Sequence, residues 1–345
     1  MRRASRLAIV PVALALLVAA CGDDGDSDDT TTTTDTETSV PAPDGIEVGV
    51  GINDPEDANV AVLEFLPEEV SVEVGTDVTW QWQGTEPHSV TFLSPGQELP
   101  PPGDPSVFEP TAADTTSYDG TSFVNTGLLP LSPEAPPPFT MSFASAGDYS
   151  YYCVIHPAMV GQVTVTEAGG DVDTPADVAE RRADETEQFL EEGRAVKEEL
   201  ASADPVTVKN DDGSTTWTIE MGATTEHVDV LAFAPTPAGI KAGDTVKFVN
   251  NSGAPHTASF FGEGAEPITS PLDPRTDAPA PGPSPQTLAS AGFFNTGLLP
   301  PDAPPGAGPP EAARSFEFKV PDAGSYAYVC ILHAPSEMVG TITAS

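Results

Sequence analysis

Apolar and polar residues alternate along several short stretches of the chain with the two-residue period of a β-strand. Val70–Val74 alternates in this way, Gly75–Asp77 is a turn signal, and Val78–Trp82 alternates again. Later in the chain, Gly239–Asp244 followed by Thr245–Val249 repeats that order. Short alternating runs bounded by turn residues predict β-strands joined by tight connections.

Proline-rich segments interrupt these patterns. Because proline lacks the N–H that a strand ladder requires, we expect loops over Pro95–Pro110, Pro267–Pro285 and Pro301–Pro310. The whole chain has 38 Pro and 30 Gly, which favours many short strands over long helices. The pattern therefore predicts an all-β protein made of sandwiches.

One acidic segment, residues 168–206, departs from the β pattern. Thr174 is a good N-cap, Pro175 suits the first helical position, and Asp177 and Glu180 favour the N-terminal turns. We therefore expect a single helix over residues 175–202, either a spacer or a helix that rests on one domain. Its few apolar residues are Val178, Phe189, Leu190, Val196 and Leu200.

The chain contains an internal duplication. Four motifs occur twice in the same order: Ala61–Phe65 and Asp229–Phe233, Glu86–Phe92 and Ala254–Phe260, Asn125–Pro130 and Asn295–Pro300, and Ala146–Cys153 and Ala323–Cys330. Small loop insertions in the second copy explain why the offset grows along the chain. We predict two domains, over residues 46–167 and 207–345, joined by the helical linker 168–206.

The first 20 residues have the pattern of an export signal. Three arginines precede Leu7–Ala20, an apolar run that is too short to span a bilayer. Val18–Cys21 resembles a bacterial lipobox, which implies cleavage before Cys21 and a lipid on that cysteine; the alternative is a cleaved signal with Cys21 free. Residues 21–45 are rich in Asp, Gly and Thr and predict a disordered tether. We therefore expect a lipoprotein anchored to the outer face of the cell membrane.

The chain is strongly acidic, with a formal net charge of −40. Such a surface repels nucleic acid and anionic headgroups, so neither is an expected partner. The acidic bias has two interpretations: solubility or adaptation to salt, and docking to a basic partner.

Two cysteine-containing loops carry the candidate chemistry. Cys153 is followed by His156 and Met159, and Cys330 is followed by His333 and Met338. In each copy a second histidine lies far upstream in a Pro-His step, His88 in the first and His256 in the second. One thiolate and two imidazoles in a trigonal plane, with a weak axial thioether, are the ligands of a blue-copper site.

Both copies resemble the plastocyanin/azurin family of small blue copper proteins. Cys153–Met159 has the loop spacing of amicyanin-like and pseudoazurin-like members, and Cys330–Met338 has the plastocyanin spacing. The resemblance implies two tandem cupredoxin-like Greek-key β-sandwiches, joined by the helical spacer, with one copper ion in each. The implied ligands are His88, Cys153, His156 and Met159 in the first site, and His256, Cys330, His333 and Met338 in the second.

The resemblance also implies that His156 and His333 lie near the surface and pass electrons out of the protein. Plastocyanins usually have Asn after the first histidine ligand, whereas this chain has Ser89 and Thr257. We therefore expect the hydrogen bonding around each site to differ from that of the family.

Several residues have a second interpretation. In an exported protein, Cys153 and Cys330 could instead form a disulfide, and the two methionines could be plain core residues. His227 is the one histidine outside the two sets, and we expect an exposed strand residue rather than a ligand. The aromatic residues near the sites could carry electrons or fill the core: Trp80, Trp82, Tyr149, Tyr151, Tyr326 and Tyr328.

The histidine count bears on function. Multicopper oxidases and copper nitrite reductases also stack cupredoxin domains, but they need further histidine clusters, and this chain has only five His. We therefore expect no enzyme, but one-electron transfer between redox partner proteins by two copper ions. Copper storage or delivery is the alternative, and an adhesion module on an inactive scaffold is a third.

Overall fold

The computed structural model describes residues 45–345 except 102–103, 112–114, 131–134, 157, 263–283, 289–292 and 303–307. The predicted signal segment, Cys21 and the tether up to residue 44 lie outside these residues, as does most of Pro267–Pro285. Within the described ranges, no helix is long and apolar enough to cross a membrane.

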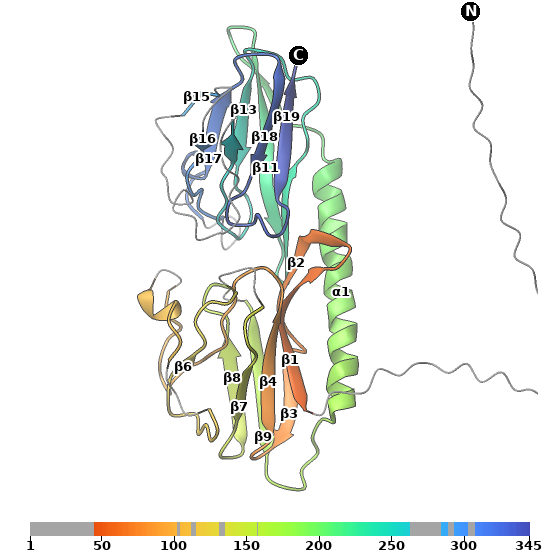
Figure 1. Cartoon of the computed structure of the whole chain (residues 1–345), viewed down its shortest axis with the longest axis vertical. Helices are drawn as coiled ribbons and strands as arrows, with labels where there is room; N and C mark the ends of the chain where they lie inside the picture. The colour runs from red at the N-terminus through yellow and green to blue at the C-terminus, as the bar shows by residue number, and fades with distance from the viewer. Residues whose placement is uncertain are drawn as a thin grey trace, which may run out of the picture. The chain divides into compact units, whose positions relative to one another are not determined.

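The N-terminal half (residues 46–166) is built of short strands, as its alternating pattern predicts (Figure 1). Their bounds are β1 Ile46–Asp54, β2 Asp57–Leu66, β3 Glu69–Glu73, β4 Asp77–Gln83, β5 Thr91–Phe92, β6 Val124–Asn125, β7 Phe139–Ser142, β8 Gly147–Tyr152 and β9 Val160–Thr166. They form the sheet order β2-β1-β4-β7 and a second sheet, β3-β9-β8-β5-β6. Trp80 and Phe65 from the first sheet meet Tyr151 and Phe92 from the second in one buried cluster, so the core lies between the two sheets.

The C-terminal half (residues 207–345) repeats this arrangement. Its strands are β10 Thr207–Lys209, β11 Thr215–Thr224, β12 Val228–Ala234, β13 Thr245–Val249, β14 Ser259–Phe261, β15 Gln286–Thr287, β16 Phe293–Asn295, β17 Ser315–Lys319, β18 Gly324–Val329 and β19 Val339–Ala344. The order β15-β17-β13-β11-β12, with β10 beside β11, faces a second sheet, β16-β14-β18-β19. Phe248, Phe318, Phe260 and Tyr328 fill the core of this half. Two short 3-10 turns, Pro105–Val107 and Glu311–Ala313, lie in the loops.

One sheet runs through both halves. β12 of the C-terminal half pairs antiparallel with β2 of the N-terminal half, with Val228 opposite Val62 and Val230 opposite Val60. The result is a continuous ten-stranded sheet. The two halves therefore share a backbone ladder.

The helix is confirmed with the predicted bounds, Pro175–Ser202 (α1). Thr174 caps it in a reciprocal capping box with Asp177, as its sequence favours. Phe189 and Leu190 are buried in one cluster with β2 and β12. The helix thus rests on both halves, and the interpretation that it contacts one domain alone is wrong.

Candidate metal centres

Each cysteine stands at the end of a strand and begins a closed loop. Cys153 follows β8 and Cys330 follows β18. The Cys153 N–H donates to the Met159 carbonyl over 3.1 Å, and the Cys330 N–H donates to the Met338 carbonyl over 2.9 Å. Both methionines are buried in the same apolar clusters as the cysteines. The core interpretation and the axial-ligand interpretation of these methionines are therefore compatible.

The upstream histidines are held by the repeated Asn-Thr-Gly-Leu-Leu-Pro motif. His88 exchanges both backbone hydrogen bonds with Leu129, and His256 does the same with Leu299. These pairings bring each histidine beside the cysteine loop, although the two are far apart in sequence. The sequence shows this motif twice, and the structure shows that it holds the backbone of the upstream histidine.

The same motif also fixes the strand that follows the histidine. Thr126 Oγ1 accepts a hydrogen bond from the Val90 N–H, and Thr296 Oγ1 accepts one from Ala258, each over 2.9 Å. The two threonine hydroxyls therefore hold equivalent strands in equivalent positions.

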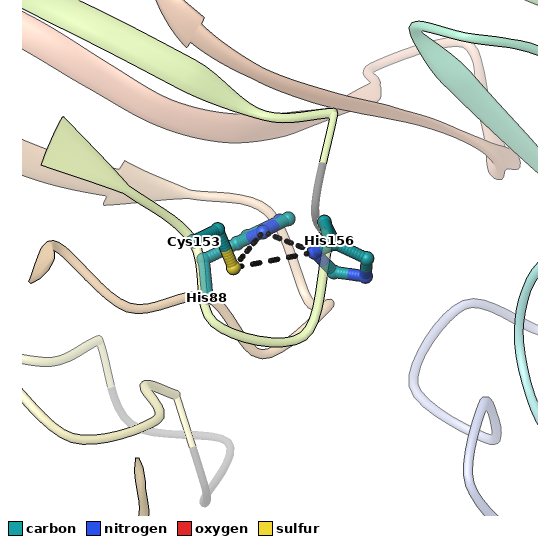
Figure 2. A group of neighbouring side chains, drawn as sticks. All are labelled: His88, Cys153 and His156. Atoms are coloured by element: carbon teal, nitrogen blue, oxygen red, sulfur yellow. Dashed lines mark hydrogen bonds between the residues drawn. The ribbon is translucent and has the colours of Figure 1, made fainter. Parts of the chain in front are cut away.

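Three donor atoms form a compact triangle in each half. In the N-terminal half, Cys153 Sγ lies 3.8 Å from His88 Nδ1 and 3.5 Å from His156 Nδ1, and the two nitrogens are 3.0 Å apart (Figure 2). In the C-terminal half, Cys330 Sγ lies 3.7 Å from His256 Nδ1 and 3.3 Å from His333 Nδ1. The two nitrogens there are again 3.0 Å apart.

These triangles fit one metal ion each. The centre of a triangle with such sides lies about 2 Å from every donor, which is the range of metal–nitrogen and metal–sulfur bonds (~2.0–2.3 Å). The donor set of one thiolate and two imidazoles, buried beside a methionine, is that of a blue-copper site. His88, Cys153 and His156 make the first set, and His256, Cys330 and His333 make the second.

The histidines favour the thiolate form of each cysteine. Burial raises the pKa of the Cys153 thiol, but His156 and His88 outweigh it and bring that pKa well below its ordinary value. For Cys330 the opposing effects are burial and the rings of His333 and His256, with the same result. A thiolate is the form that binds a metal ion.

Ser89 and Thr257 connect the two ligand-bearing segments. The Ser89 N–H donates to Cys153 Sγ over 3.5 Å, while its Oγ accepts from the Val154 N–H over 3.0 Å. Thr257 makes the same pair of bonds with Cys330 Sγ and the Ile331 N–H. The backbone N–H of Ser89 or Thr257 is thus the donor to each sulfur, and the hydroxyl that stands in place of the usual Asn side chain accepts from the backbone beyond the cysteine.

Two glycines that sequence reasoning missed make room for the upstream histidines. Gly51 and Gly222 lie at register shifts in β1 and β11, with φ values of +57° and +83°. A Cβ on Gly51 would lie 2.4 Å from His88 Nε2, and one on Gly222 would lie 3.0 Å from His256 Nε2. A positive φ and a close ring both favour glycine. The sequence does carry a signal for them, because a glycine inside a strand often marks a bulge or a close approach of another group.

The two sites differ in what surrounds their histidines. His256 Nε2 lies 2.8 Å from Ser252 Oγ, whereas no described group hydrogen-bonds to His88 Nε2. His333 is only 5% exposed, so the prediction that its ring reaches the surface is wrong. Its Nε2 lies 3.1 Å from an oxygen of Glu86, which belongs to the other half. His156 is half-buried.

The structure also bears on the remaining alternatives. Both Cys153 and Cys330 are free, so the disulfide between them is contradicted. His227 belongs to neither triangle, but the expectation of an exposed strand residue is wrong. It is half-buried in the bend before β12, because it stacks on Phe189 and contacts Glu64. The buried aromatic residues Trp80, Trp82, Tyr151 and Tyr328 pack in the two cores.

A thiolate and two imidazoles that converge between strand ends and loops of a β-protein are the arrangement expected of a copper-binding cupredoxin. Comparisons with known proteins agree. Residues 55–166 match the family model for copper binding proteins of the plastocyanin/azurin family. A plastocyanin from Scenedesmus fuscus is 30% identical over 126 residues, which make up 36% of this chain and 96% of that protein. The chain belongs to the plastocyanin/azurin family.

Solved structures of amicyanin mutants are also similar to this chain. One in the Cu(I) form and one in the oxidized form are each 21% identical, covering 36% of this chain and 86% of the amicyanin chain, with a TM-score of 0.23.

Proposed function

We propose that this protein transfers single electrons through two mononuclear type 1 copper sites, one in each of two tandem cupredoxin sandwiches. The observation that carries the proposal is the pair of donor triangles, which repeat the same residue types at nearly the same distances. Bound copper would supply a one-electron couple between Cu(I) and Cu(II). His88, Cys153, His156 and Met159 would hold one ion, and His256, Cys330, His333 and Met338 would hold the other.

The packing of the donors supports electron transfer over storage or delivery. Cys153, Cys330, His88 and His256 are each at most 1% exposed, and backbone hydrogen bonds close both cysteine loops. A fixed donor set changes little between oxidation states, which favours fast one-electron exchange. Delivery instead requires that the ion leave readily, and these buried sulfurs do not favour that.

The proposal also covers where the protein is located and which partners it has. A lipid on Cys21 would anchor the chain outside the cell membrane, and the segment up to residue 45 would act as a tether. The partners would be redox proteins rather than nucleic acid, since the chain carries a net charge of −40. With four of five histidines assigned, we propose an electron carrier and not an enzyme.

Copper titration of the full chain tests the two sites. We expect two ions per chain, an intense blue colour in the oxidised state, and a type 1 EPR signal. Cys153→Ala should retain one blue site, because each triangle is built within one half. A stoichiometry of one, or a colourless Cu(II) form, would refute the two-site proposal.

Electron transfer is separated from storage by redox cycling. A carrier returns to the blue state through repeated rounds of reduction and oxidation without losing copper. Release of copper on reduction would support the storage or delivery alternative instead.

A further inference from the structure

The longer cysteine loop of the C-terminal half contacts the N-terminal half. Ser336 is fully buried, and its Oγ lies 2.6 Å from Thr85 Oγ1 and 3.3 Å from Glu86 Oε1. Its carbonyl accepts a hydrogen bond from Asn59 Nδ2 over 2.7 Å. This loop has two more residues between histidine and methionine than Cys153–Met159 has. Ser336 lies in that longer stretch, which therefore joins the second ligand set to the other half.

Glu86 links the two ligand sets. Its Oε2 lies 3.1 Å from His333 Nε2, while Nδ1 of the same ring faces Cys330. Along the chain, Glu86 stands only two residues before His88. Its side chain and that of His333 are 7% and 6% exposed, so bulk water has little access to the contact.

The second half has no counterpart of this carboxylate. Ala254 occupies the equivalent position before the other Pro-His step and is buried. The backbone at this step therefore does not require an acidic side chain. Burying a carboxylate without a partner is costly, so the position of Glu86 is explained by the groups that it contacts.

We propose that Glu86 and the His333 ring form the bridge through which an electron passes between the two metal centres of one chain. The inference rests on the proposed function. The route runs from His88 along the backbone to Glu86, then across the hydrogen bond to His333. With copper bound at both sites, one electron would pass from Cu(I) at one site, leaving Cu(II), to Cu(II) at the other, giving Cu(I). No proton moves, because the Nε2–H stays on His333.

This arrangement gives the two histidines different tasks. The His333 side chain is only 6% exposed and offers little surface to a protein in solution, whereas the half-buried His156 remains partly accessible. Electrons therefore enter or leave through the first site, and the second site communicates through Glu86.

The test follows the redistribution of one electron within the chain. The experiment uses copper-loaded wild type, Glu86→Ala, Glu86→Gln and Ser336→Ala. Each protein receives a reducing pulse that supplies less than one electron per chain. Samples frozen at set times are examined by EPR, with Cys153→Ala and Cys330→Ala identifying the signal of each site. Wild type should redistribute the electron at a rate that does not depend on protein concentration. In Glu86→Ala that rate should fall about 10-fold or more, as loss of an outer partner of a metal ligand can cause.

The other variants separate the bridge from its surroundings. Glu86→Gln keeps an oxygen that accepts from His333 Nε2–H and should retain the rate, as should Ser336→Ala. The potential of each site is measured in every variant, so that a change in driving force is distinguished from loss of the route. Glu86→Leu replaces Glu86→Ala if the alanine variant does not fold.

A second readout does not depend on electron flow. In the Cu(I)-loaded protein, NMR should show a slowly exchanging His333 Nε2–H in wild type and Glu86→Gln, and a fast-exchanging one in Glu86→Ala. A wild-type redistribution rate in Glu86→Ala, with both sites blue, would overturn the bridge. Absence of two blue sites in wild type would instead overturn the proposed function, and the spectra reveal this before any kinetics.

Discussion

At the scale of single residues, groups beside the donors hold each donor set in place. Ser89 and Thr257 each give a backbone N–H to sulfur and accept from the following loop. Gly51 leaves space for His88, which has no hydrogen-bonding partner on its outer nitrogen among the described residues. The position of the His88 ring is therefore set by packing, and packing can be changed by one methyl group.

Gly51→Ala should weaken the first proposed copper site and leave the second proposed site unchanged. The new Cβ would lie 2.4 Å from His88 Nε2, and the φ of +57° disfavours any side chain. We expect the first site to lose about 10–100-fold in copper affinity, the effect of disturbing a metal ligand's outer contacts. Competition titration with a copper chelator measures this change.

Gly75→Ala is the matched control. Gly75 also has a positive φ, +84°, but nothing lies within 4 Å of its added Cβ. The Gly75→Ala substitution should lower the free energy of unfolding without changing copper affinity at either site. Equal copper affinity in Gly51→Ala and wild type would show that the ring has room to move.

At the scale of secondary structure, α1 and the β2–β12 pair join the halves. The helix has few apolar residues, yet Phe189 and Leu190 meet Val60 and Val62 from one half and Val228 from the other. Gly193 permits this approach, because a Cβ there would lie 2.4 Å from Val60 Cγ1. The few apolar residues of α1 are thus sufficient to pack the helix against both β2 and β12.

Phe189→Ala should destabilise the chain while leaving both donor sets intact. Phe189 is 5% exposed, and large-to-small changes of a buried Phe cost about 3–5 kcal/mol. Urea unfolding of the metal-free protein measures the loss, and copper stoichiometry at low urea should remain that of wild type. Val206→Ala, at a 61% exposed position, serves as the control and should change stability by about 0.5 kcal/mol or less. If Phe189→Ala lowers the free energy of unfolding no more than the control does, packing of α1 against β2 and β12 contributes little to stability.

At the scale of the whole molecule, the acidic chain buries a second carboxylate between its halves, Glu64, in addition to Glu86. Burial raises the pKa of Glu64 to about 7, although its hydrogen bond to His227 opposes this, and Glu68 and Glu226 add to the rise. Burial lowers the pKa of His227, but Glu64 and its neighbours outweigh it and the net direction is upward. The pair thus holds protons more tightly when folded than when unfolded.

This pair predicts a pH dependence of folding. Above the ordinary pKa of a glutamate the unfolded chain binds fewer protons than the folded chain, so stability falls as pH rises towards 7. His227 acts in the same direction, since its raised folded pKa adds stability that is present at low pH and lost as pH rises through that pKa. Glu64→Gln should flatten the dependence between about pH 5 and 7. Urea unfolding of the metal-free wild type and variant across this range measures it, and parallel profiles would contradict the assignment.

The sequence by itself determined what short-range spacing can encode. The Cys-x2-His loops, the strand that precedes each one, and the capped helix at 175–202 follow from local periodicity and from side-chain contacts within a few residues. The internal duplication also identified the upstream histidines, because a Pro-His step that appears once in each copy marks equivalent positions.

Only the tertiary structure decided how the two halves meet. Glu86 and His333 are separated by most of the chain, and no period or motif relates them, so their contact required the β2–β12 ladder and the folded loop. The covered ring of His333 follows from that contact, and family resemblance predicted the opposite. Burial of a polar pair depends on what surrounds it in three dimensions, and a linear pattern of residues does not specify those surroundings.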